Sequence, residues 1–134
     1  MDELTTEPGA YLLVIDLEAP LALAKGVILP PGRYGYCGSA YGPGGIRARV
    51  ARHLKRRKTI HWHIDRLTAA GRIVAVNSEP GGDECALMDG LRAQSGVSIP
   101  APGFGSSDCR RCPAHLASLP PEFTPPGRRE KKAR

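Results

Sequence analysis

The chain has 134 residues, a length that favours one domain able to bury a modest core without disulfides or metals. Its formal charge of +6 fits an anionic partner. No apolar run is long enough to span a bilayer, and the acidic opening "MDELTTEPGA" lacks the apolar segment of a signal peptide. We therefore expect a cytoplasmic protein that does not enter a membrane, and the sequence indicates no obligatory protein partner.

The first half of the chain predicts strands. The β-rich apolar run "AYLLVIDL" (10–17) is typical of a buried strand. A short strand is expected within "AKGVILPPG" (24–32), before its Pro-Pro-Gly turn, and a longer one over "RYGYCGSA" (33–40), with both tyrosines on one face. The glycine-rich "YGPGG" (41–45) predicts a loop after it.

A helix is expected from Ile46, because Ile46, Val50 and Leu54 recur every four residues and would form its buried stripe. Polar side chains share another face of this helix by the same spacing: Arg49, Arg52, His53 and Arg56.

The second half predicts a helix over 61–71 that ends at Gly71, a strand over 72–78, and a helix over 82–94 with acidic residues in its first turn. The remainder is interpreted as mostly loop. The element order β-(β)-β-α-α-β-α predicts an α/β (α+β) fold with a small three-stranded antiparallel sheet flanked by helices. Residues 1–119 would form one domain, and 120–134 a basic, disordered tail.

Basic residues gather in two segments, as in proteins that contact phosphates. The first segment holds Arg47, Arg49, Arg52, Lys55, Arg56, Arg57 and Lys58, and the second holds Arg128, Arg129, Lys131, Lys132 and Arg134. As nucleic-acid contacts we select Arg47, Arg52, Arg56 and Lys58.

Two short motifs resemble those of a known family. Gly9-Ala10-Tyr11 and Tyr36-Cys37-Gly38 resemble the two strand motifs of the GIY-YIG nuclease superfamily, and Arg49 follows the second motif on a helix as that family's arginine does. Glu84, with Leu87 and Met88 after it, resembles the family's metal-binding helix. The phrases "YGYCGSAYGPGGIRARVARHL", "HWHIDRL" and "GFGSSDCRRCPAHL" resemble an uncharacterised branch that is sometimes fused to a DNA glycosylase. The resemblance covers about residues 9 to 116.

The sequence departs from the family pattern in two places. The separation of Tyr11 from Tyr36 implies an insertion, over residues 18–32. Gly32-Arg33-Tyr34 is an alternative first motif, but it shares a strand with Tyr36 and cannot pair with it in a hairpin, so we prefer Tyr11. Ser39 stands where several members of the superfamily place a lysine, which removes one phosphate contact.

The resemblance implies a metal-dependent endonuclease that hydrolyses DNA phosphodiester bonds, in DNA repair or processing. Glu84 would hold Mg²⁺ or Mn²⁺ through one carboxylate, and Arg49 would clamp a phosphate oxygen. The proton of the attacking water requires a base, which could be Tyr11 or Tyr36 if nearby positive charge lowers the tyrosine pKa. His53, one helical turn after Arg49, is the alternative base.

The cysteines raise a separate question. A cytosolic location favours thiols or metal ligands over disulfides. Four side chains have a spacing that zinc would accept: Cys85, Cys109, Cys112 and His115. One Cys-x-x-Cys pair is less than a full zinc signature, so buried thiols are the preferred interpretation, and Cys37 is expected to be inert.

Two other functions fit parts of the pattern. A nucleic-acid-binding module that keeps the fold without cutting would suit the absence of a lysine at Ser39. A small structural zinc protein, whose basic face serves solubility or RNA contact, would suit the cysteines. Metal-dependent nicking of a plasmid separates the nuclease from both, and elemental analysis for zinc tests the last.

Overall fold

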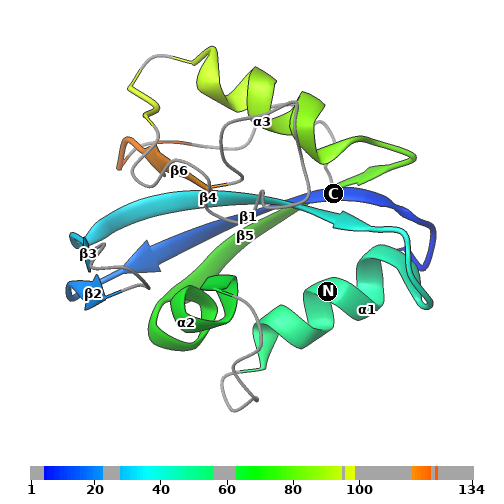
Figure 1. Ribbon diagram of the computed structural model, residues 1–134, viewed down its shortest axis with the longest axis horizontal. Helices are drawn as coiled ribbons and strands as arrows, with labels where there is room; N and C mark the ends of the chain where they lie inside the picture. The colour runs from blue at the N-terminus through cyan, green and yellow to red at the C-terminus, as the bar shows by residue number, and fades with distance from the viewer. Residues whose placement is uncertain are drawn as a thin grey trace.

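The computed structural model of the chain describes residues 5–22, 28–55, 63–94, 96–98, 116–121 and 123. These residues form three layers, with an antiparallel sheet in the middle (Figure 1). Helices α1 (Gly45–Leu54) and α2 (His63–Ala70) cover one face of the sheet, and α3 (Glu84–Arg92) covers the other. The expected mixed fold, with an antiparallel sheet flanked by helices, is confirmed. None of the described helices has the length and apolar character needed to cross a membrane.

The sheet has four described strands rather than the expected three. Their order is β5-β1-β4-β6, formed by β5 (Arg72–Pro80), β1 (Gly9–Leu17), β4 (Gly32–Ala40) and β6 (Leu116–Leu119). Strand β6 lies in the stretch that the sequence predicts to be mostly loop. Its four residues are too few to show an alternating pattern, and it forms by pairing with β4, from Tyr36 opposite Leu116 to Arg33 opposite Leu119.

A separate two-stranded sheet occupies the insertion between β1 and β4. It pairs β2 (Leu21–Ala22) with β3 (Ile28–Leu29), while residues 23–27 between them lie outside the described part. Among the described residues of the expected 24–32 stretch, the short strand is present as β3. The other predicted strands and the three predicted helices are confirmed, with bounds shifted by a few residues.

Helix α1 begins at a backbone conformation that favours glycine. Gly45 has a φ of 63°, and a Cβ built on it would collide with the carbonyl of Thr6. The amides of Ile46 and Arg47 donate to the carbonyls of Glu7 (3.0 Å) and Thr5 (2.9 Å), so the segment before β1 caps the helix.

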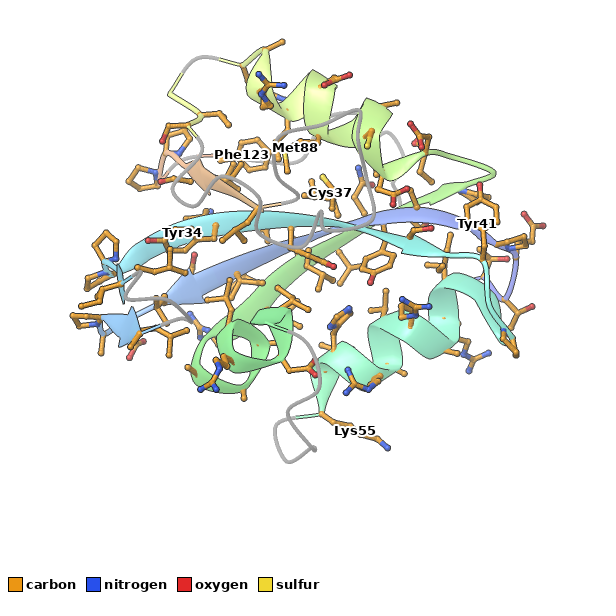
Figure 2. The ribbon with its side chains drawn as sticks, in the orientation of Figure 1. Tyr34, Cys37, Tyr41, Lys55, Met88 and Phe123 are labelled. Atoms are coloured by element: carbon orange, nitrogen blue, oxygen red, sulfur yellow. The ribbon has the colours of Figure 1, made fainter. Side chains whose placement is uncertain are left out.

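The core lies on both faces of the sheet because β1 is a central strand that is buried on both sides. Its odd-numbered residues pack toward α1 and α2, and its even-numbered residues Leu12 and Val14 pack toward α3. On the α3 face lie Met88, Cys37 and Phe123 (Figure 2). Phe123 is buried although it falls in the segment expected to be a tail, whereas residues 124–134 lie outside the described part and their disorder stays a prediction.

The buried stripe of α1 differs from the expected one at its last turn. Ile46 and Val50 are fully buried as predicted, but Leu54 is 37% exposed and His53 takes its place at 1% exposure. A step of three or of four residues after Val50 reaches nearly the same helix face, so the spacing alone did not decide between them. The burial of His53 places an imidazole inside the molecule.

Candidate active site

Two tyrosines and a histidine pack together between the sheet and α1. Tyr11 on β1 lies opposite Gly38 on β4, and Tyr36 on β4 lies opposite Leu13, so the two tyrosines are diagonal neighbours on one face. Their ring centroids are 6.4 Å apart. The ring of His53 lies 5.6 Å from that of Tyr11 and 5.9 Å from that of Tyr36.

Gly38 makes room for this arrangement. A Cβ built at Gly38 would collide with Cζ and Oη of Tyr11, so the ring of the first motif covers the glycine of the second. The two motifs are therefore parts of one packing unit, in which a side chain larger than hydrogen at position 38 would displace the Tyr11 ring.

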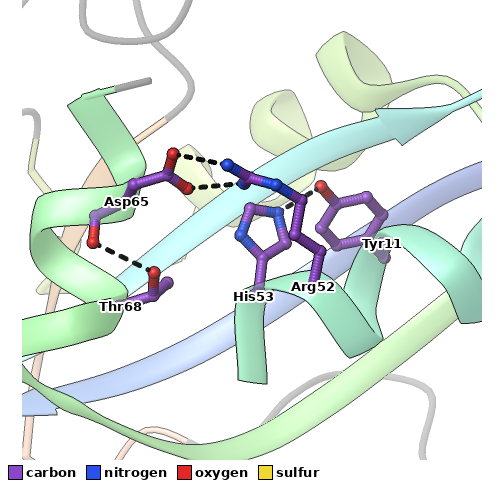
Figure 3. A network of polar contacts seen from close by, with 5 residues as sticks. All are labelled: Tyr11, Arg52, His53, Asp65 and Thr68. Atoms are coloured by element: carbon purple, nitrogen blue, oxygen red, sulfur yellow. Dashed lines mark hydrogen bonds and ion pairs between the residues drawn. The ribbon is translucent and has the colours of Figure 1, made fainter. Parts of the chain in front are cut away.

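Tyr11 and His53 share a buried hydrogen bond. The distance from Tyr11 Oη to His53 Nε2 is 2.8 Å, and each residue is 1% exposed (Figure 3). Arg49, half-buried and one turn before His53 on α1, also hydrogen-bonds to Tyr11. The guanidinium can only donate, so the phenol oxygen accepts from Arg49.

Burial controls the acidity of both phenols. It raises the pKa of Tyr11 above its usual value, and Tyr36 adds to the rise, while Arg49 opposes it. Burial likewise raises the pKa of Tyr36 to about 12, against the opposing effect of Arg49. The expected lowering by Arg49 is thus present but outweighed, and both tyrosines carry their protons at neutral pH.

Glu84 lies at the start of α3, half-buried, where Asp83 caps the helix by accepting from the amide of Ala86 at 3.0 Å. Its negative charge contributes to the raised pKa of both Tyr11 and Tyr36, so the carboxylate is within electrostatic reach of both rings. The structure thus brings four predicted site residues into one cluster: Tyr11, Tyr36, Arg49 and His53. The fifth, Glu84, acts on the two tyrosines of this cluster through its charge.

A single carboxylate is a sparse metal site. Within the described residues no three His, Cys, Asp or Glu side chains come together as ligands. Mg²⁺ is nevertheless commonly held by one or two carboxylates, with water completing its shell. Glu84 offers one half-buried carboxylate whose charge reaches both phenols, and a single carboxylate fits that pattern.

One protein family matches nearly the whole chain. The family described as "Domain of unknown function DUF123" matches residues 10–131. The chain belongs to this family. No curated protein and no solved structure matches it. All five candidate catalytic residues lie inside the segment that matches DUF123.

One basic residue of this DUF123 domain, Arg52, is expected to contact nucleic acid but instead forms an ion pair within the protein. It donates through Nη1 and Nη2 to the two carboxylate oxygens of Asp65, at 2.8 and 3.0 Å (Figure 3). Asp65 is fully buried, so the pair ties α1 to α2. Arg47 is exposed, as a phosphate contact requires, while Arg56 and Lys58 lie outside the described residues.

The cysteines also depart from expectation. Cys85 is buried in α3 and disulfide-bonded, so the expected thiol is absent there and it offers no thiolate to zinc. The other suggested ligands, Cys109, Cys112 and His115, lie outside the described residues. Cys37 is a buried free thiol whose pKa burial raises to about 12, with Glu84 adding to the rise, in keeping with an inert residue.

Two contacts beside the site were missed by sequence reasoning. One is the Arg52–Asp65 pair, whose partners come from different helices and carry no common motif. The other joins Tyr41, just after β4, to the carbonyl of Gly82, at 2.7 Å. An aromatic residue directly after the second motif was visible in the sequence, but its partner is a backbone atom and leaves no signal.

Proposed function

We propose that this protein is a metal-dependent endonuclease of the GIY-YIG type that hydrolyses DNA phosphodiester bonds. The observation that carries the proposal is the meeting of Tyr11, Arg49 and His53 in one hydrogen-bonded cluster, with Tyr36 packed against it. These residues come from β1, β4 and α1, and the charge of Glu84 acts on both tyrosines. Such a convergence of a base, a phosphate-binding cation and a carboxylate suits phosphodiester hydrolysis.

The hydrogen bonds suggest a path for the proton. Tyr11 keeps its proton at neutral pH and accepts from Arg49, so its own hydrogen is best donated to Nε2 of a neutral His53. In the proposed step a water oxygen attacks phosphorus and the P–O bond to the leaving ester oxygen breaks. The water proton passes to Tyr11 Oη as the phenol proton moves to His53 Nε2, and the leaving oxygen takes a proton from solvent. The raised pKa of Tyr11 is compatible with this step, because the phenol gains a proton as it gives one up and a full phenolate is never formed.

Arg49 and Glu84 handle charge in this proposal. The guanidinium of Arg49 donates to Tyr11, and in the proposal it would also donate to a phosphate oxygen and so fix the phosphate beside the base. Mg²⁺ or Mn²⁺ bound at Glu84 would supply positive charge over the negative charge that develops on the phosphate.

Plasmid nicking tests the proposal. The full-length protein should convert supercoiled DNA to open circles with Mg²⁺ or Mn²⁺, and should not do so with EDTA. Glu84→Gln should abolish nicking while DNA affinity, measured by anisotropy without metal, is retained. The matched control is Glu79→Gln, an exposed carboxylate at the end of β5, which should nick at the wild-type rate. Nicking by Glu84→Gln at the wild-type rate, with unchanged Mg²⁺ dependence, would place the metal elsewhere.

A non-catalytic nucleic-acid-binding module is the second candidate. Ser39, in place of a lysine that several members of the superfamily carry, favours it. It predicts DNA binding that weakens with rising salt and shows no metal-dependent nicking at any protein concentration. Disulfide bonding of Cys85 makes the third possibility, a structural zinc site that includes this residue, the weakest.

A further inference from the structure

Tyr41 is exposed and yet held in place. It is 58% exposed, and it is the only aromatic among the exposed large hydrophobic side chains of the described residues. Its hydroxyl nevertheless donates to the carbonyl of Gly82 at 2.7 Å. An exposed tyrosine with a free hydroxyl would sample several rotamers, whereas this ring is fixed at both ends, by its backbone and by its oxygen.

The ring lies where the two halves of the proposed site meet. Its neighbour Gly42 lies against Arg49, since a Cβ built there would be 3.9 Å from Nη2 of that arginine. Its hydrogen-bond partner Gly82 stands two residues before Glu84, in the turn between β5 and α3. Figure 2 shows Tyr41 at the end of β4, reaching toward that turn. The side chain therefore joins the arginine-bearing side of the site to the carboxylate-bearing side.

We infer that the Tyr41 ring is a stacking platform for an unpaired nucleobase next to the phosphate that Arg49 binds; the inference rests on the proposed function. A fixed ring loses little side-chain entropy when a base stacks on it. Base-on-aromatic stacking tolerates any base, because each has a π face. The exposed cation of Arg47 in the first turn of α1 adds attraction for the backbone of the same strand.

Stacking of this kind selects for DNA structure rather than sequence. In an intact duplex each base is already stacked on both sides, so the ring can be used only by a base that is unpaired or extruded. The substrate class that follows is DNA with a single-stranded overhang, flap or mismatch beside the cut.

A fluorescence titration tests the inference without relying on cleavage. The probe is a short DNA duplex with a single-stranded overhang that contains 2-aminopurine, compared with a fully paired duplex containing the same base. Binding of the full-length protein is measured in EDTA, so that no probe is cut. Wild-type protein should quench the overhang probe and bind it about tenfold more tightly than the paired duplex.

The variants separate stacking from general contact. Tyr41→Ala should lose both the quenching and the preference, and Tyr41→Phe, which keeps the ring but not the bond to Gly82, should retain most of the preference. Ile28→Ala, which removes an aliphatic side chain that is 64% exposed on β3, is the control and should behave as wild type. Equal binding of both probes by wild type, or a preference that survives in Tyr41→Ala, overturns the inference.

The two experiments distinguish a failure of this inference from a failure of the nuclease proposal. If plasmid nicking is observed but Tyr41→Ala keeps its preference, the stacking inference fails while the nuclease function stands. If wild type quenches the probe through Tyr41 but never nicks a plasmid, the nuclease proposal fails and the base platform belongs to a binding module.

Discussion

The paired strands β1 and β4 carry polar side chains at both of their ends. At one end these side chains form a partly exposed ion pair, and at the other they form a buried hydrogen bond with α1. At one end Asp16 lies opposite Arg33 and accepts from its Nε and Nη2 at 2.7 and 2.9 Å, with both side chains about a quarter exposed. At the other end Tyr11 and His53 are buried together. At the first end, the hydrogen bond from Arg33 stabilises the ionised carboxylate of Asp16 and is the main cause of its lowered pKa. The second keeps its phenols protonated.

The comparison shows where reactivity can reside. A partly exposed ion pair such as Asp16–Arg33 satisfies both of its partners and leaves few hydrogen-bonding groups to a substrate. The buried phenol of Tyr11, bonded to an imidazole and a guanidinium, can give its proton to the imidazole as it receives one from a water molecule, as the proposed step requires. The alternative motif Gly32-Arg33-Tyr34 lies at the structural end, where the Tyr34 hydroxyl donates to the carbonyl of Pro30. We therefore regard Tyr11 as the better choice for the first motif.

The largest effect is expected at the ion pair between Arg52 and the fully buried Asp65, which supports α1. Arg52→Met leaves the fully buried carboxylate of Asp65 without its guanidinium, and should lower the free energy of unfolding by about 3–5 kcal/mol. The matched variant Arg33→Met breaks a pair that remains partly hydrated and should cost about 1 kcal/mol or less. Urea unfolding at pH 7 measures both. Equal losses would mean that burial does not distinguish the two pairs.

The next effect concerns the rate of cleavage. Arg49→Ala removes a fixed donor beside the proposed base and should reduce the rate by about a hundredfold or more. Arg47 is exposed two residues earlier, so Arg47→Ala should weaken binding only, and modestly at high salt. Single-turnover rates at saturating protein separate the two effects. If Arg47→Ala abolished cleavage and Arg49→Ala did not, the cluster of Tyr11, Arg49 and His53 would not be the active site.

A smaller effect is expected when the two motifs are forced apart. Gly38→Ala places a methyl group against Tyr11 and should lower the cleavage rate about tenfold or more by shifting the phenol. The control is Gly35→Ala on the same strand, whose new methyl group would face the tips of Leu119, Leu91 and Leu12 on the α3 side. It should leave the single-turnover rate unchanged. A rate loss that is the same in both variants would indicate general damage to β4.

Much of this arrangement could be predicted from the sequence, and the remainder could not, for physical reasons. The long strands and the helices have periodic apolar residues, and the motifs fix the order of Tyr11, Arg49 and Glu84 along them. Strand β6 depends on a partner distant in the chain and has no pattern of its own. The burial of His53 in place of Leu54 depends on the hydroxyl of Tyr11, which a helical repeat does not reveal.

The smallest effect is a pH dependence at the structural end. The pKa of Asp16 is lowered from its ordinary 3.8 in the folded state, so its pair with Arg33 contributes stability above that value and loses it as the pH falls through the folded pKa. Asp16→Asn should therefore be less stable than wild type by about 1 kcal/mol or less at pH 7, and the difference should shrink below about pH 4. Thermal unfolding between about pH 7 and pH 3 measures the difference. A gap that grows on acidification would mean that Arg33 does not hold the carboxylate ionised, and the contrast between the two ends would then rest on burial alone.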